Sequence, residues 1–146
     1  MARAKISEAS KSLISDNGAI IASLAIGEQI QLNMKFEWLT SIDASQVRCT
    51  AVEGINDGNG SKPTGVKPNG VVRDLDLIIP ASGGNNVIMV LPKDLGLNFD
   101  PQPQPDHSVF AYIDIEVSDT AVGVRKQIWK PFRGLVELLY SPTGAN

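Results

Sequence analysis

The chain of 146 residues has a single cysteine, Cys49, and a single histidine, His107. One cysteine cannot form a disulfide within the chain, so folding does not require an oxidising compartment. One histidine and one cysteine are also too few for a zinc site built from the usual ligands. We therefore expect neither a metal nor a cofactor.

Long hydrophobic runs and long basic runs are missing as well. The longest apolar run, residues 19–26, is interrupted by Ser23 and is too short to span a bilayer. It follows acidic residues, which is not typical of a signal peptide, so we expect synthesis in a cytoplasm without a cleaved signal. The net charge is −3 and no basic cluster exceeds Arg125-Lys126, so we expect neither a nucleic-acid nor a membrane partner.

The sequence also lacks the motifs of common catalytic sites. His107 stands beside Asp106, but no Gly-x-Ser-x-Gly elbow supplies a nucleophile for it. Cys49 lies between apolar neighbours in a strand-like pattern, which favours a buried core residue over a reactive thiol. We therefore expect a protein that is not an enzyme.

Acidic residues occur in two close pairs, Asp74 with Asp76 and Asp114 with Glu116. Glycoside hydrolases use two carboxylates, but charges on a solvated strand face explain these pairs better. Residues 57–61 resemble the start of a calcium loop. Pro68 stands where that loop needs an acidic residue, so the motif fails.

The clearest positive signal is a period of two. Between residues 28 and 38, Ile30, Leu32 and Met34 alternate with polar residues, as in a strand with one buried and one solvated face. Similar patterns predict strands at 109–117 and 71–79, and weaker ones at 46–52, 87–91, 124–129 and 134–140. About seven strands separated by turn signals are typical of an all-β sandwich, which is the fold class we expect.

The connections between these strands are rich in turn-forming residues. Residues 54–70 contain many Gly, Asn, Lys and Pro residues and predict a flexible, solvent-facing loop. Pro131 has no amide to donate to a ladder, so we expect one strand to end at Trp129 and the next to begin at Arg133-Gly134.

The first 27 residues differ from the rest of the chain. We expect residues 1–27 to form an extended N-terminal arm and residues 28–146 to form the sandwich domain. Ile6, Leu13 and Ile14 fit one face of a helix, although a hairpin turning at Asn17-Gly18 fits about as well. If the arm serves assembly rather than the core, a chain that starts at residue 27 should still fold.

The last predicted strand is apolar on both faces, with Glu137 between Leu135 and Leu139. One face must pack in the core, so another subunit or the arm is expected to cover the other and to supply a cation or donor for Glu137. Phe110 and Tyr112 share the polar face of their own strand. The candidate interface residues are Leu135, Glu137, Leu139, Phe110, Tyr112, Ile6, Leu13 and Ile14.

The C-terminal half resembles a family of phage proteins. The stretches VIMVLPKDL at 87–95, FAYIDIEV at 110–117 and WKPFRGLVELLYSPT at 129–143 follow a characteristic order: a tyrosine-bearing alternating strand, a short hairpin, Arg-Gly and a final strand. This order resembles small tail proteins akin to the N-terminal domain of baseplate upper proteins. The resemblance covers residues 71–143 and implies an immunoglobulin-like sandwich that adapts fibres or receptor-binding proteins to a tail. The arm and residues 54–70 depart from the pattern, which leaves the attachment mode open.

These observations favour a virion structural protein from a bacteriophage tail, baseplate or fibre adaptor. Such a subunit is expected to bind other virion proteins and to form a homo-oligomer, with a trimer favoured. A capsid decoration protein would use the same sandwich and arm. A carbohydrate-binding module is a third possibility, and it predicts a monomer with an exposed aromatic strip.

Overall fold

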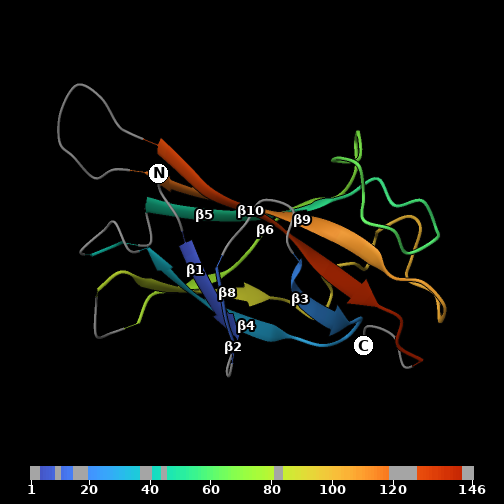
Figure 1. Cartoon of the computed structure of the whole chain (residues 1–146), viewed down its shortest axis with the longest axis horizontal. Helices are drawn as coiled ribbons and strands as arrows, with labels where there is room; N and C mark the ends of the chain where they lie inside the picture. The colour runs from blue at the N-terminus through green and yellow to red at the C-terminus, as the bar shows by residue number, and fades with distance from the viewer. Residues whose placement is uncertain are drawn as a thin grey trace.

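The computed structural model describes residues 4–8, 11–14, 20–36, 41–43, 46–80, 84–118 and 128–142 of the chain; for residues 4–14 and 128–133 only the backbone is described. The described residues form two β-sheets that face one another, joined by turns and loops (Figure 1). No α-helix occurs among these residues. The expectation of an all-β sandwich is therefore confirmed.

The first sheet has five strands in the order β2-β1-β4-β8-β7. Its neighbouring strands are all antiparallel. The strands are β1 (Ala4–Glu8), β2 (Lys11–Ile14), β4 (Ile30–Phe36), β7 (Leu77–Ile78) and β8 (Asn86–Leu91).

The second sheet has five strands in the order β3-β10-β9-β5-β6. All pairs are antiparallel except β3 with β10, which run parallel. The strands are β3 (Ile20–Ala25), β5 (Val47–Glu53), β6 (Val72–Asp74), β9 (Val109–Ser118) and β10 (Ile128–Leu139).

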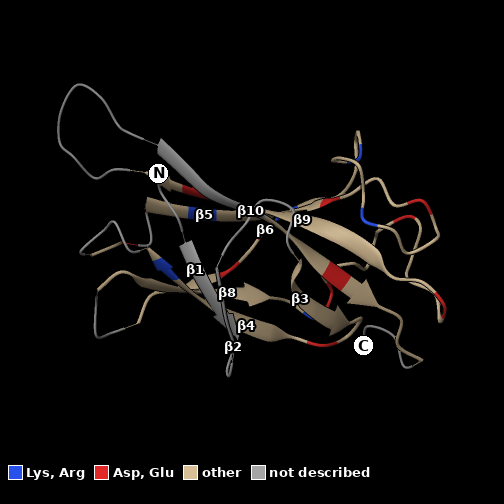
Figure 2. Ribbon diagram, viewed as in Figure 1, with Lys and Arg blue, Asp and Glu red and all other residues tan. Residues whose placement is uncertain are grey.

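The core lies between the two sheets and follows from the period of two. Alternate residues of each strand point inward, so β4 contributes Leu32, Met34 and Phe36, all fully buried. Strand β9 presents Ile113 and Ile115 from the opposite sheet in the same core cluster. Charged residues occur on the strands as well as in the loops (Figure 2). Burial of these alternating apolar side chains is the main force that holds the sheets together.

Two strand boundaries differ from the sequence prediction. The single strand predicted at 71–79 is two short strands, β6 and β7, which belong to different sheets. Buried Leu75 lies between them, so the chain crosses from one sheet to the other over the core.

The expected strand break at Pro131 is wrong, because β10 runs from Ile128 to Leu139 as one strand. Its ladder with β9 shifts register between Trp129 and Phe132, so Lys130 and Pro131 have no partner position in it. A β-bulge thus accommodates the proline that lacks an amide donor. The part of the predicted 124–129 strand before residue 128 lies outside the described residues.

The division of the chain at residue 27 is also wrong for β3. Ile21, Ala22 and Leu24 belong to the core cluster, and β3 pairs along β10. The segment is not a helix in its described parts: β1 and β2 form a hairpin, and β1 pairs with β4. This hairpin does not turn at Asn17-Gly18, since its two strands end and begin at Glu8 and Lys11. Removal of residues 1–26 would therefore take core residues away.

We predict that Leu24→Ala lowers the free energy of unfolding by about 2–5 kcal/mol, because it leaves a cavity in the core. Ile20→Ala, a change on the same strand at a partly exposed side chain, should cost less than about 1 kcal/mol. Urea denaturation followed by circular dichroism measures both. Equal effects of the two substitutions would show that β3 does not pack as described.

Candidate functional site

The outer face of the second sheet carries two large buried side chains that do not belong to the core cluster. Phe110 on β9 and Leu135 on β10 are each only 2% exposed, yet neither is a member of that cluster. Since Ala111 and Val136 point into the core, their strand neighbours Phe110 and Leu135 point to the opposite face. Something in the chain must therefore cover this face.

The loop between β5 and β6 lies against β9. The Asn56 side chain accepts a hydrogen bond from the Phe110 amide (2.9 Å) and donates one to its carbonyl oxygen (3.2 Å). The Tyr112 hydroxyl donates to the Pro63 carbonyl oxygen at 3.0 Å. Gly54 admits this close packing, because a Cβ atom there would lie 2.8 Å from the Pro63 ring. The loop faces solvent as predicted, since none of residues 55–70 is buried, but it is also hydrogen-bonded to the sheet.

Glu53 fixes the base of this loop. Its buried carboxylate accepts hydrogen bonds from the Val71 amide (3.1 Å), the Asp100 amide (2.9 Å) and the Lys67 ammonium (3.2 Å). Lys67 also donates to the Asp100 carbonyl oxygen at 2.7 Å. A buried carboxylate is stable only when it is paired in this way. Glu53 therefore joins the loop 54–70 to the segment that precedes β9.

Glu137 receives its donors from the chain itself. The hydroxyl of Ser23 on β3 donates to one carboxylate oxygen at 2.8 Å, and the hydroxyl of Ser108 donates to the other at 2.7 Å. The sequence predicted a donor from the arm or from a second subunit. Ser23 lies within residues 1–27, so the segment expected to be an arm supplies one of the two donors.

The candidate interface residues thus separate into groups. Phe110 and Leu135 are covered within the chain and are not available to a partner in the way the sequence suggested. Tyr112 is half-buried against the loop, and Leu139 is 39% exposed at the end of β10. Ile6, Leu13 and Ile14 lie in β1 and β2, and their side chains are outside the described part of the chain.

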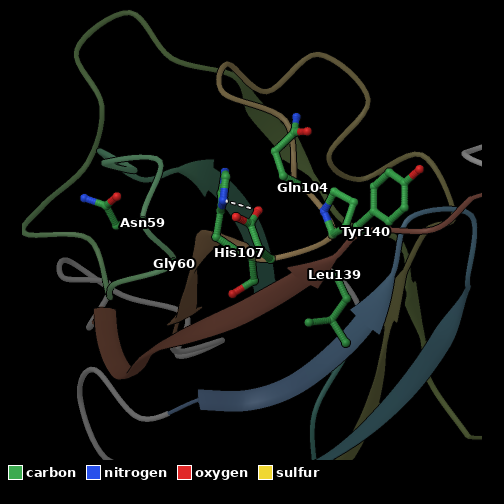
Figure 3. Close-up of a pocket in the computed structure, with 9 residues that line it drawn as sticks. Asn59, Gly60, Gln104, His107, Leu139 and Tyr140 are labelled. Carbon is green, nitrogen blue, oxygen red and sulfur yellow. Dashed lines mark ion pairs between the residues drawn. The ribbon is translucent and has the colours of Figure 1, made fainter.

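His107 lies in an open hollow on the molecular surface with a volume of about 450 Å³. Its Nδ1 atom is 2.9 Å from a carboxylate oxygen of Asp106, and Figure 3 shows the imidazole between Asn59 and Gln104. The neighbouring Ser108 hydroxyl donates to Glu137 and not to this pair. The lining residues are Asn59, Gly60, Gln104, Pro105, Asp106, His107, Ser108, Leu139 and Tyr140.

The other candidate catalytic residues, Asp74 and Cys49, have contacts that indicate a structural role. Asp74 is paired with Arg48 at 3.1 Å, and both side chains are largely exposed. Cys49 is buried in the core, as predicted, and burial together with the nearby Asp114 carboxylate raises the pKa of its thiol to about 12.

Within the described ranges, no three His, Cys, Asp or Glu side chains come together as metal ligands. No helix in the described part of the chain is long and apolar enough to cross a membrane.

No protein-family model matches this sequence, and no curated protein matches it significantly.

We predict that the Cys49 thiol does not react with a thiol reagent such as 5,5′-dithiobis(2-nitrobenzoate) in the folded protein at about pH 8. With its pKa raised to about 12, the thiol is protonated as well as buried. Full reaction should appear only in denaturant, which can be followed by absorbance. Rapid stoichiometric labelling of the native protein would contradict the core position of Cys49.

We predict that Glu53→Gln lowers the free energy of unfolding by about 1.5–3 kcal/mol. An amide group replaces one acceptor oxygen, so at least one donor among Val71, Asp100 and Lys67 loses its charged partner. Asp76→Asn, at an exposed carboxylate, is the matched control. Equal stability of the two variants in urea would show that Glu53 does not anchor the loop.

Proposed function

We propose that this protein is a non-enzymatic structural subunit of a bacteriophage tail or baseplate, which connects fibres or receptor-binding proteins to the tail. The proposal includes an immunoglobulin-like form of the sandwich. It also includes other virion proteins as partners and the virion as the location. One observation carries it: the order of the strands in the two sheets.

Immunoglobulin-like sandwiches have seven principal strands, A to G, with A-B-E-D in one sheet and G-F-C in the other. Taken in chain order, β1, β4, β5, β7, β8, β9 and β10 give β1-β4-β8-β7 in the first sheet and β10-β9-β5 in the second. These are the A-B-E-D and G-F-C orders. The remaining strands, β2, β3 and β6, each extend an edge of a sheet. The strand order therefore agrees with the fold that the phage resemblance of residues 71–143 implies.

The surface supports a role in assembly. The β6–β7 flank is here defined as Val72–Asp74 and Leu77–Ile78. Among the described residues, each of its two strands is the last strand of its sheet on that side. It exposes the apolar side chains of Val72 and Ile78. Short strands at open edges can pair with, or pack against, a second chain. We infer that copies of this protein associate through the β6–β7 flank.

The carbohydrate-binding module is less well supported, because the aromatic pair that the sequence suggested as its binding site, Phe110 and Tyr112, is not an exposed surface. Phe110 is buried, and the Tyr112 hydroxyl donates to the Pro63 carbonyl oxygen, so these two rings do not form an exposed platform. A capsid decoration protein would share the same fold and edges. Its position in the particle is the property that separates it from a tail subunit.

The test of location is an image of the particle that carries a tag on this chain. If the chain is a tail or baseplate subunit, electron microscopy with a gold-labelled tag should show label at the tail, arranged with the symmetry of that structure. Label distributed over the capsid would support the decoration protein instead. Label that is absent from purified particles would contradict any virion role.

We predict that Val72→Asp combined with Ile78→Asp converts the assembled protein to monomers without unfolding it, because both side chains are exposed in the single chain. Charges placed in an apolar contact must be desolvated, which opposes association. Leu97→Asp, at another exposed apolar residue, is the control and should assemble like the wild type. Sedimentation velocity distinguishes the species. Unchanged assembly of the double variant would place the interface elsewhere.

A further inference from the structure

Two chain segments, the loop at 57–60 and the turn at 104–107, form one wall of the hollow beside His107. Residues 104–107 make a tight turn in which the Gln104 amide donates to the His107 carbonyl oxygen (2.8 Å), and the His107 amide donates to that of Gln104 (3.2 Å). Gly60 packs against this turn with a positive φ of 79°, and a Cβ atom there would lie 3.2 Å from His107 Cβ. The loop at 57–60 and the turn at 104–107 therefore meet as a fixed surface.

Several polar groups of different kinds line the hollow. Asp106 offers acceptor oxygens and is 87% exposed, while Asn59 and Gln104 each offer an amide that can both donate and accept. His107 is held by its contact with Asp106 at 2.9 Å. Adjacent ligand hydroxyls, which donate and accept at the same time, match this mixture of groups.

The opposite side of the hollow is apolar. Leu139 is the last residue of β10 and Tyr140 follows it; they are 39% and 44% exposed, and Pro105 is also part of the lining. Figure 3 shows the Tyr140 ring on the far side of Gln104 from His107. An exposed aromatic ring next to hydrogen-bonding groups suits a ligand that has one apolar face and polar edges.

The charge of the lining narrows the class of ligand further. No lysine or arginine is among the described residues that line the hollow, and Asp106 contributes a negative charge. An anionic ligand would meet this carboxylate without a fixed cation to balance it. The volume of about 450 Å³ lies in the usual range of small-molecule sites, roughly 300–1,000 Å³.

We propose that the hollow binds a neutral saccharide. Vicinal hydroxyls of a sugar ring would donate to Asp106 and exchange hydrogen bonds with Gln104 and Asn59, while the C–H face of the ring packs against Tyr140. This binding site does not depend on the location of the protein in a particle. It differs from the Phe110 and Tyr112 platform, in which Phe110 is buried and Tyr112 is half-buried.

The experiment is a titration of the ¹⁵N-labelled full chain with glucose, galactose, mannose and N-acetylglucosamine, followed by amide chemical shifts. At least one of these sugars should cause saturable shifts at amides around the hollow, such as those of Gly60, His107 and Tyr140. Asp106→Ala should weaken the binding about tenfold or more, since hydrogen bonds to a charged group are lost. Tyr140→Ala should weaken it as well, whereas Tyr140→Phe keeps the ring and should retain binding.

Two comparisons make the test specific. Asp76→Ala removes an exposed carboxylate outside the hollow and should bind like the wild type. Glucuronate, which adds a negative charge to the same ring, should bind more weakly than glucose. The proposal is overturned if no neutral sugar gives saturable shifts, if Asp106→Ala and Tyr140→Ala bind like the wild type, or if glucuronate binds best. None of these results bears on gold labelling of the particle, so the two proposals can fail separately.

Discussion

The structure depends on one constraint, which is that β10 is apolar on both of its faces and each face must be kept from water. Val136 and Leu138 fill the core between the sheets, and Leu135 lies on the other side of the same strand. A strand of this kind needs two coverings, and only one of them comes from the opposite sheet. The loop 54–70 contacts this side of the second sheet at Tyr112 and bonds to the main chain of Phe110 on neighbouring β9. Glu137 lies between apolar residues on that outer side and is stabilised by two serine hydroxyls.

The loop that packs on the second sheet has polar backbone groups, and these groups need hydrogen-bond partners. A loop can lie on a sheet only if its backbone finds hydrogen-bond partners, and the amides of Gly54, Ile55 and Lys67 donate to the carbonyl oxygens of Phe110, Gly65 and Glu53. The same arrangement brings the 57–60 loop against the turn at 104–107 and so forms the hollow. The loop thus lies at the Phe110–Tyr112 end of β9, whereas the β6–β7 flank, the hollow beside His107 and the outer face around Asp114 and Glu116 stay accessible. We therefore expect partners to contact the edges and small ligands to enter the hollow.

The alternation of apolar and polar residues predicted those strands whose burial depends only on their own sequence. Alternation located β4, β5, β8 and β9, because one face of each is buried. The position of β3 could not be predicted, since its parallel partner lies more than a hundred residues further along the chain. The loop 54–70 has the composition of an exposed loop, and its packing depends on individual contacts of Asn56, Pro63 and Lys67 that composition does not reveal. Glu53 had a signal that was missed: it follows Val47, Cys49 and Ala51 on the buried face of one strand. A charged residue at an inward position indicates a buried and paired carboxylate.

The most direct test of this account is amide hydrogen exchange of the protein at a dilution where it is monomeric. The amides of Gly54, Ile55, Lys67 and Phe110 donate within the chain, to Phe110, Gly65, Glu53 and Asn56 respectively. If the chain covers its own outer face, these amides should exchange many-fold more slowly than those of an unstructured peptide, and the protection should not depend on protein concentration. Exchange at the unstructured rate in the monomer, with protection appearing only on assembly, would show that a partner provides the cover and would contradict the account.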